Sequence, residues 1–187
     1  MRSPFHRANQ WGRSKEQGVA NLVDSRQPNS RHCFVCGVAN PFGLHLHFEN
    51  SGPGEVTAEY TVPENYQGYP GVVHGGVVAA MLDEMAGRAH MGGDTPRFMF
   101  TARLDIRYRK NVPVGQPLRL VGKALKSRGR TATSRASVYG PDGSLLAEAD
   151  ALLVDLPAET LGSADIQALG WRVYSDEEIE ELAAQAS

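Results

Sequence analysis

The chain has 187 residues, of which 41% are hydrophobic and 21% are charged, and its formal net charge is -2. This length and composition fit a soluble globular chain with one sizeable core or two very small ones. The near-neutral charge argues against nucleic-acid binding, and no apolar run approaches the ~18 residues that span a membrane. Two cysteines are too few for a disulfide framework, so we expect a reducing, cytoplasmic setting.

The N-terminal end of the chain is basic. Residues 1–30 are rich in arginine and poor in acids, and we expect them to form an arm that is extended or partly disordered. The arm lacks the apolar core of a secretory signal, and its arginines leave a transit peptide as a weaker alternative.

After the arm, the hydrophobic period changes from that of a strand to that of a helix and back. Residues 56–62 alternate as a half-buried strand, residues 64–73 form a loop rich in Gly and Pro, and residues 75–90 form an apolar helix. Short turns join the strands that follow, which is typical of an α+β fold with one antiparallel sheet around one long helix. These later strands are expected at residues 98–109, 118–126, 131–139 and 145–156.

The predicted helix is apolar around most of its circumference, so it must be enclosed. One sheet cannot cover every side. We therefore expect a second copy of the chain to cover the remainder, in a homodimer or a dimer of dimers.

The chain ends in an acidic tail, residues 158–187. Within it, Ser175 and Glu178 have the spacing of a capping box, in which each residue satisfies the other's backbone amide. We therefore expect a short C-terminal helix.

Two adjacent acids, Asp83 and Glu84, interrupt the apolar helix. Glu84 has Arg88 four residues later, the orientation that favours an ion pair on a helix, so we expect a solvated or rim salt bridge there. Asp83 has only small residues at the neighbouring helical positions, which cannot pair with it and leave room for a ligand. Because an unpaired buried carboxylate is costly, Asp83 is either catalytic or satisfied by a backbone amide or water.

A double glycine starts the helix. The first amide N–H groups of a helix have no intrahelical partner, and glycine allows a ligand to approach the backbone closely. Gly75 and Gly76 therefore offer a site for a developing oxyanion. His74 either polarises a carbonyl or fixes the loop, and Gln67 either orients a water or carbonyl or is merely solvated.

The stretch GYPGVVHGGVVAAMLDE resembles the signature of hotdog-fold acyl-CoA thioesterases, notably the phenylacetate-pathway type, in which an acid follows HGG at this spacing. The similarity continues through FTARLDIRYRKNVPVGQPL and GRTATSRASVYGPDGSLLAEADALL. The earlier segment CFVCGVANPFGLHLHFEN looks like the first strand region of such proteins. The resemblance implies a hotdog domain at residues 31–157, an acyl-CoA substrate and no cofactor.

By the same resemblance, Asp83 matches the acid that acts as general base or nucleophile on the thioester. The Gly75 amide matches the group that polarises the thioester carbonyl, and Gly76 lies beside it. His74 and Gln67 match supporting polar groups.

Thr101 matches a residue that orients the attacking water in some members of the family. The strand at residues 98–109 alternates strictly, however, and this pattern puts Thr101 on the same face as Arg103 and Asp105. The alternation therefore argues against this role for Thr101.

A CoA thioester also brings phosphates and an acyl chain. The basic turn at residues 126–130 and the basic group at residues 107–110 each have the charge to pair with phosphate, and each is equally well explained as solvated charge. The resemblance mildly favours the turn, and we expect an apolar acyl pocket. The predicted substrate-binding residues are Lys126, Arg128, Arg130, Tyr69, Met91 and Phe98.

Cys33 and Cys36 have the C-x2-C spacing that forms half of a common zinc site. His45 and His47 would have to supply the other half, and their alternation also fits one face of a strand. Buried free thiols at a turn are the better interpretation, so no metal ligand is predicted.

The leading hypothesis is hydrolysis of acyl-CoA thioesters by Asp83 with the Gly75 and Gly76 amides. One alternative is a hotdog hydratase or dehydratase, which uses a histidine and an acid on the acyl chain. Another is a module that binds acyl-CoA without turnover. The position of His74 directly before the glycines favours hydrolysis over hydration.

Overall fold

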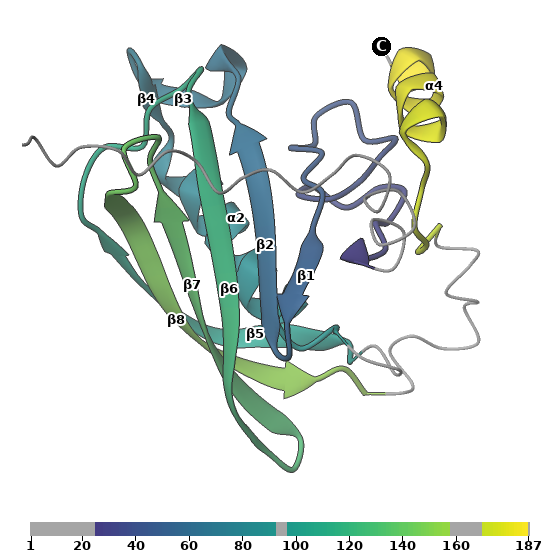
Figure 1. Cartoon of the computed structure of the whole chain (residues 1–187), viewed down its shortest axis with the longest axis vertical. Coiled ribbons are helices and arrows are strands. Elements are labelled where there is room, and N and C mark those ends of the chain that lie inside the picture. Colours follow the sequence, from purple (N-terminus) through teal and green to yellow (C-terminus); the bar gives the residue numbers. More distant parts are fainter. Residues whose placement is uncertain (1–24, 93–96, 158–169, 187) are drawn as a thin grey trace, which may run out of the picture.

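The computed structural model describes residues 25–92, 97–157 and 170–186 (Figure 1). Most of the predicted N-terminal arm and residues 158–169 of the predicted tail lie outside the described residues. The elements are β1 (Glu49–Gly52), β2 (Glu55–Thr61), η1 (Glu64–Tyr66), β3 (Gln67–Tyr69), β4 (Val72–Val73), α2 (Gly75–Arg88), β5 (Met99–Tyr108), β6 (Pro117–Arg128), β7 (Thr131–Tyr139), β8 (Leu145–Asp155) and α4 (Asp176–Ala186).

One antiparallel sheet, in the order β1-β2-β6-β7-β8-β5, curls around α2 (Figure 1). Met81, Leu82 and Met85 of the helix are fully buried in the core between them. Helix and sheet approach each other closely at Gly122 of β6, where a Cβ atom would lie 2.2 Å from the Met85 carbonyl oxygen. Only glycine permits this approach. The predicted α+β fold, a sheet around one long helix, is confirmed.

β5 departs from the strict alternation that the sequence predicted. Thr101 pairs with Leu153 of β8 and Arg103 pairs with the next residue, Leu152, so Ala102 is the extra residue of a β-bulge. The bulge reverses the faces of the strand. Thr101 therefore points toward α2, whereas the Arg103 side chain is 71% exposed. The predicted grouping of Thr101 with Arg103 is wrong.

Two segments differ from the predicted pattern in a simpler way. Residues 64–73, expected as a loop, contain the turn η1 and the short hairpin β3–β4. Residues 33–50, which resembled a first strand region, are in a strand only at their last two residues, because β1 begins at Glu49. Within this segment His45 has a positive φ of 56°, which interrupts the extended backbone.

Both ends of the described chain pack against the sheet-and-helix body. Gln27 and Asn29 are 3% and 4% exposed, and Asn29 bridges to Arg172. Packed structure thus begins before the expected boundary at residue 31. The predicted capping box of α4 is present: the Ser175 amide donates to Glu178 Oε2 at 2.9 Å, and the Glu178 amide donates to Ser175 Oγ at 3.2 Å. No helix in the described part of the chain has the length and hydropathy needed to cross a bilayer.

Candidate active site

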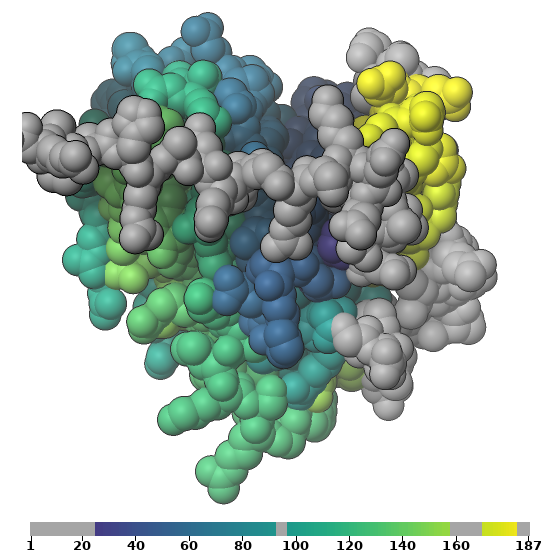
Figure 2. Space-filling view, viewed as in Figure 1, coloured from purple at the N-terminus to yellow at the C-terminus, as the bar shows by residue number. Residues whose placement is uncertain are grey.

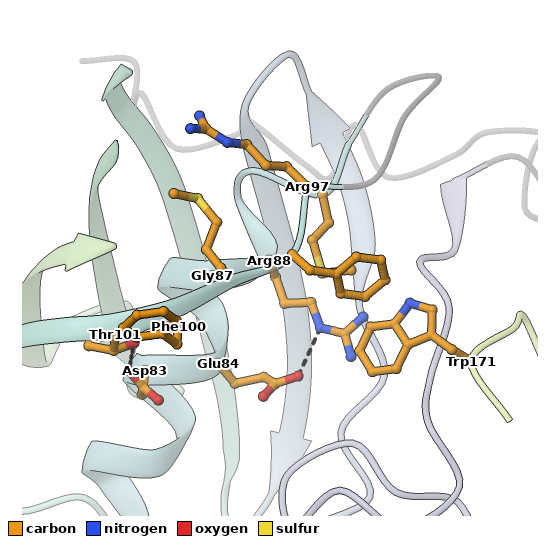
Figure 3. A pocket seen from close by; sticks show the side chains of 11 residues that line it. Asp83, Glu84, Gly87, Arg88, Arg97, Phe100, Thr101 and Trp171 are labelled. Carbon is orange, nitrogen blue, oxygen red and sulfur yellow. Dashed lines mark hydrogen bonds and ion pairs between the residues drawn. The ribbon is translucent and has the colours of Figure 1, made fainter. Parts of the chain in front are cut away.

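Asp83 lies in the second half of α2 and is held by the neighbouring strand. The Thr101 hydroxyl donates to Asp83 Oδ1 at 2.5 Å (Figure 3). No hydrogen bond to Asp83 Oδ2 is found among the residues that the structure describes. One oxygen of the carboxylate is therefore fixed, and the other is available to accept a proton or to attack a carbonyl.

A cavity of about 280 Å³ adjoins Asp83 and Thr101. It lies between the C-terminal half of α2, the start of β5 and the Trp171 ring (Figure 3). Met91 and Phe98, which were predicted to contact an acyl group, line this cavity. The complete lining is Asp83, Glu84, Gly87, Arg88, Met91, Arg97, Phe98, Met99, Phe100, Thr101 and Trp171.

The predicted ion pair between Glu84 and Arg88 is present, with Arg88 Nε 2.9 Å from Glu84 Oε1. It is not a solvated or rim pair, because the Arg88 side chain is only 1% exposed. The guanidinium lies 4.3 Å from the centre of the Phe48 ring and 4.8 Å from that of Trp171, and it donates to the Pro28 carbonyl. Glu84 thus neutralises a buried cation that connects α2 to both ends of the described chain.

The N-terminal end of α2 is exposed to solvent. His74 Nδ1 accepts the Gly76 N–H at 3.0 Å and caps the helix. This geometry matches the alternative in which His74 fixes the loop, and it occupies the Gly76 amide. No acceptor for the Gly75 N–H is found within the described residues, and the Gly75 carbonyl accepts from the Tyr108 hydroxyl at 2.8 Å. Of the two glycine amides, that of Gly75 is therefore the one left free of a hydrogen bond within the described residues.

Gln67 and Tyr69 lie on β3, beside this exposed end of α2. Gln67 Oε1 accepts the Gly71 N–H at 3.4 Å, and Tyr69 is 80% exposed and does not line the cavity. Because an α-helix rises about 1.5 Å per residue, Gly75 and Asp83 stand about 12 Å apart along the axis. Within one chain, these two groups cannot act on the same carbonyl.

The predicted basic turn connects β6 to β7. Lys126, Arg128 and Arg130 are exposed on this hairpin, which projects from the rest of the chain (Figure 1, Figure 2). Arg97, which lines the cavity, donates from Nη2 to the Gly129 carbonyl at 2.9 Å. Arg97 therefore links the basic turn to the cavity.

Cys33 and Cys36 are free thiols. The hydrogen bond from the Cys36 thiol lowers the pKa of Cys33 to about 7, and the same bond and burial raise the pKa of Cys36. Neither His45 nor His47 belongs to the group of possible metal ligands around the thiols. The third member of that group is Glu84.

Several residues of the site were missed in the sequence. Trp171 lies far along the chain from α2, in a region interpreted as a separate tail. Arg97 lies in the predicted loop from Met91 to Phe98, which was expected to form part of the pocket wall, but only Met91 and Phe98 were predicted as substrate-binding residues there. Neither has a local motif. A signal for Trp171 was available, because a lone tryptophan in a polar tail is a frequent sign of packing against a distant surface.

The fold agrees with comparisons to known proteins. The family described as "Thioesterase superfamily" matches residues 70–147. A solved thioesterase superfamily protein is 34% identical, with a TM-score of 0.61, over 66% of this chain and 63% of that one. The solved zebrafish thioesterase superfamily member 2 is 21% identical, with a TM-score of 0.54, over 60% of this chain and 81% of its own. The chain therefore has the predicted hotdog fold, and its residues 70–147 are similar to the thioesterase superfamily.

The curated relatives are named more specifically than the superfamily, as acyl-coenzyme A thioesterases. The acyl-coenzyme A thioesterase THEM4 of Bos taurus is 26% identical over 140 residues, which are 74% of this chain and 57% of the relative. THEM4 of Xenopus laevis is 32% identical over 93 residues, which are 48% of this chain and 40% of the relative. The chain thus spans about half the length of the curated relatives that it matches.

Proposed function

We propose that this chain hydrolyses acyl-CoA thioesters to the free acid and CoA. The observation that carries the proposal is the Asp83 carboxylate, held by Thr101 at 2.5 Å beside a cavity. The superfamily match and the curated thioesterases support it. The HGG and the acid at its fixed spacing support placement in the phenylacetate-pathway type of the superfamily, and the two free thiols support a cytoplasmic setting.

The proposed catalytic site needs two copies of the chain. Asp83 and the Gly75 amide are too far apart in one chain, so the amide that serves a given Asp83 comes from a second copy. The following features support a homodimer, or a dimer of dimers, built across the side of the molecule that carries Asp83. β5 is an edge strand, with Phe100 46% exposed on it. The side of α2 that carries Asp83 is only partly covered in the single chain.

The chemistry of hydrolysis follows from these groups. Asp83 takes a proton from water while the water oxygen attacks the thioester carbonyl carbon. The carbonyl oxygen becomes an oxyanion and accepts the Gly75 N–H of the second copy. When the tetrahedral intermediate collapses, the C–S bond breaks, and the CoA thiolate receives the proton from Asp83. Thr101 holds the carboxylate in place throughout.

The surroundings of the site suit a CoA ester. The acyl group would enter the cavity between Met91, Phe98 and Trp171. The CoA phosphates would bind the basic turn, which Arg97 connects to this cavity. His74 caps α2 through Nδ1, a structural use of the ring that favours hydrolysis over the hydratase alternative, in which this histidine would exchange protons with the acyl chain.

The test is the release of CoA from a panel of aliphatic and aromatic acyl-CoA esters by the full chain and by Asp83→Asn. We expect the variant to fold and to lose about 10²–10⁴-fold in kcat, the usual contribution of a general base. Full turnover by the folded variant would disprove the role of Asp83. Tight binding of every ester without turnover would instead establish a binding module, and loss of enoyl-CoA absorbance without thiol release would establish a hydratase.

The same panel identifies whether Asp83 acts as base or nucleophile. In a single turnover in ¹⁸O-labelled water, attack by water on the thioester puts the label into the acid product alone. Attack by Asp83 forms a mixed anhydride, and its hydrolysis at the aspartyl carbonyl leaves the label in Asp83. Label found by mass spectrometry in the peptide that contains residue 83 would therefore establish attack by Asp83.

A further inference from the structure

The segment C-F-V-C-G, residues 33–37, folds into a tight knuckle. The backbone amides of Val35 and Cys36 both donate to Cys33 Sγ, at 3.3 and 3.5 Å. The Gly37 amide donates to the Cys33 carbonyl at 2.9 Å, and a Cβ on Gly37 would lie 2.3 Å from that oxygen. The turn therefore requires glycine. Two amides aimed at one sulfur favour its thiolate, which is the form that binds metal ions.

A carboxylate from α2 completes a group of three possible ligands. Cys33 Sγ, Cys36 Sγ and a carboxylate oxygen of Glu84 all lie within 4.8 Å of one another, and Cys33 Sγ is 3.9 Å from Glu84 Oε2. Zinc bonds of about 2.3 Å to sulfur and about 2.1 Å to oxygen place tetrahedral ligands about 3.5–3.8 Å apart. The distances between the three donor atoms are therefore at most about 1 Å longer than the distances between ligands in a zinc site.

Glu84 is oriented for this purpose by its ion pair. Arg88 Nε binds Oε1 at 2.9 Å and leaves Oε2 facing the thiols (Figure 3 shows the Arg88 side of the pair). Arg88 is itself fixed between the Phe48 and Trp171 rings. Partners that orient a metal ligand in this way tune metal affinity.

The charges of such a site balance. Two thiolates and the Glu84 carboxylate carry three negative charges, and Zn²⁺ with the Arg88 guanidinium carries three positive charges. A buried group with no net charge avoids the large cost of an isolated buried ion. Thiolates also select a borderline or soft cation, which excludes Mg²⁺ and Ca²⁺.

We propose that Cys33, Cys36 and Glu84 bind one Zn²⁺ per chain, with water as the fourth ligand. The sequence favoured free thiols because it offered only His45 and His47 as further ligands, whereas the fold supplies Glu84 from α2. The ion joins the segment before β1 to the helix that carries Asp83. It stabilises the domain whether or not Asp83 is catalytic.

The test uses the full chain without an affinity tag, purified from zinc-supplemented medium. We expect about one zinc per chain by elemental analysis, held by three protein ligands and a water. After removal of the metal by a chelator, Co²⁺ should produce thiolate-to-cobalt charge-transfer bands, and Zn²⁺ should raise the melting temperature. Cys33→Ser should lose the bands and the thermal shift, whereas His47→Ala, a change in the same segment outside the cluster, should keep both.

Three results would overturn the proposal. The first is wild-type protein without stoichiometric zinc and without thiolate-to-cobalt bands, a readout that needs no variant to fold. The second is unchanged zinc binding in Cys33→Ser. The third is a Cys33–Cys36 disulfide that forms equally fast with and without saturating Zn²⁺, which would show a dithiol that does not hold the metal.

Discussion

The two ends of α2 are built in opposite ways. The N-terminal end is exposed, begins with two glycines and leaves the Gly75 amide without a partner in the described structure. The C-terminal end is closed by Arg88, which is 1% exposed and contacts the segment before β1 and the one before α4. One end is open to solvent, and the other is packed against both ends of the described chain.

The adjacent acids Asp83 and Glu84 mark the boundary between these two ends. Glu84 pairs with a buried cation, and its contribution is to stability. Asp83 lines a cavity, and within the described residues its one hydrogen-bond partner is the Thr101 hydroxyl. An acid in an apolar helix is therefore interpreted from the groups that lie next to it in the folded chain. Substitutions at the two ends should therefore separate stability from activity.

The largest effect, on the free energy of unfolding, is expected from a substitution at the buried C-terminal end of α2. Arg88→Met leaves the Glu84 carboxylate without its cation and removes the contact to the Pro28 carbonyl. Breaking a buried pair at one partner costs about 3–5 kcal/mol. We expect a loss of this size in the free energy of unfolding, measured by urea denaturation with a metal chelator present in every sample.

The matched control is the double variant Arg88→Met with Glu84→Leu, which removes both charges. It should recover most of the loss, because an apolar pair of similar volume is often as stable as a buried ion pair. An additive loss in the double variant would show that the pair itself is not the source of the stability.

The next largest effect is expected at the open end, from Gly75→Pro. Proline suits the first position of a helix and removes the N–H group. The extended backbone of His74, with ψ of 135°, tolerates a following proline. Losing one oxyanion donor costs about 10²–10³-fold in kcat, and we expect little change in melting temperature.

Gly75→Ala is the control for this position, because it keeps the N–H. Its Cβ would lie 3.6 Å from the Tyr108 hydroxyl, an ordinary contact. Initial rates of CoA release should be higher for the alanine variant than for the proline variant. Equal rates in the two variants would mean that the amide is not a donor to the reaction.

A smaller effect is expected from Thr101→Val, which keeps the shape of the side chain and removes the bond to Asp83. We expect kcat to fall about 10- to 100-fold, less than the loss of the base itself, with KM nearly unchanged. Thr101→Ser keeps the hydroxyl and should retain most of the activity. A larger defect in the serine variant than in the valine variant would exclude the positioning role.

Much of the fold was predictable because it depends on local patterns. The period of α2, the turn before β8 and the capping box of α4 are each contained in a few consecutive residues. The resemblance also located Asp83 and the glycines. The sheet face on which Thr101 lies was not predictable. One inserted residue, Ala102, reverses the alternation, and an alanine side chain does not indicate a bulge.

The burial of Arg88 could not be predicted from a local pattern either. Spacing predicted its pair with Glu84 correctly, but burial depends on Phe48 and Trp171, which come from opposite ends of the chain. The same limit applies to the thiols. C-x2-C suggested a histidine pair close in sequence, and the fold placed Glu84 there instead.

The central claim is that Asp83 of one copy works with the Gly75 amide of another. The direct measurement is the rate of CoA release by a mixed oligomer of Asp83→Asn chains and Gly75→Pro chains. The two kinds of chain carry different affinity tags, and the mixed oligomer is purified by both tags in turn. Each homo-oligomer should be nearly inactive. In the mixed oligomer, one site of each pair regains both groups, so about half of the wild-type rate per oligomer is expected. A mixed oligomer as inactive as its parents would contradict the claim.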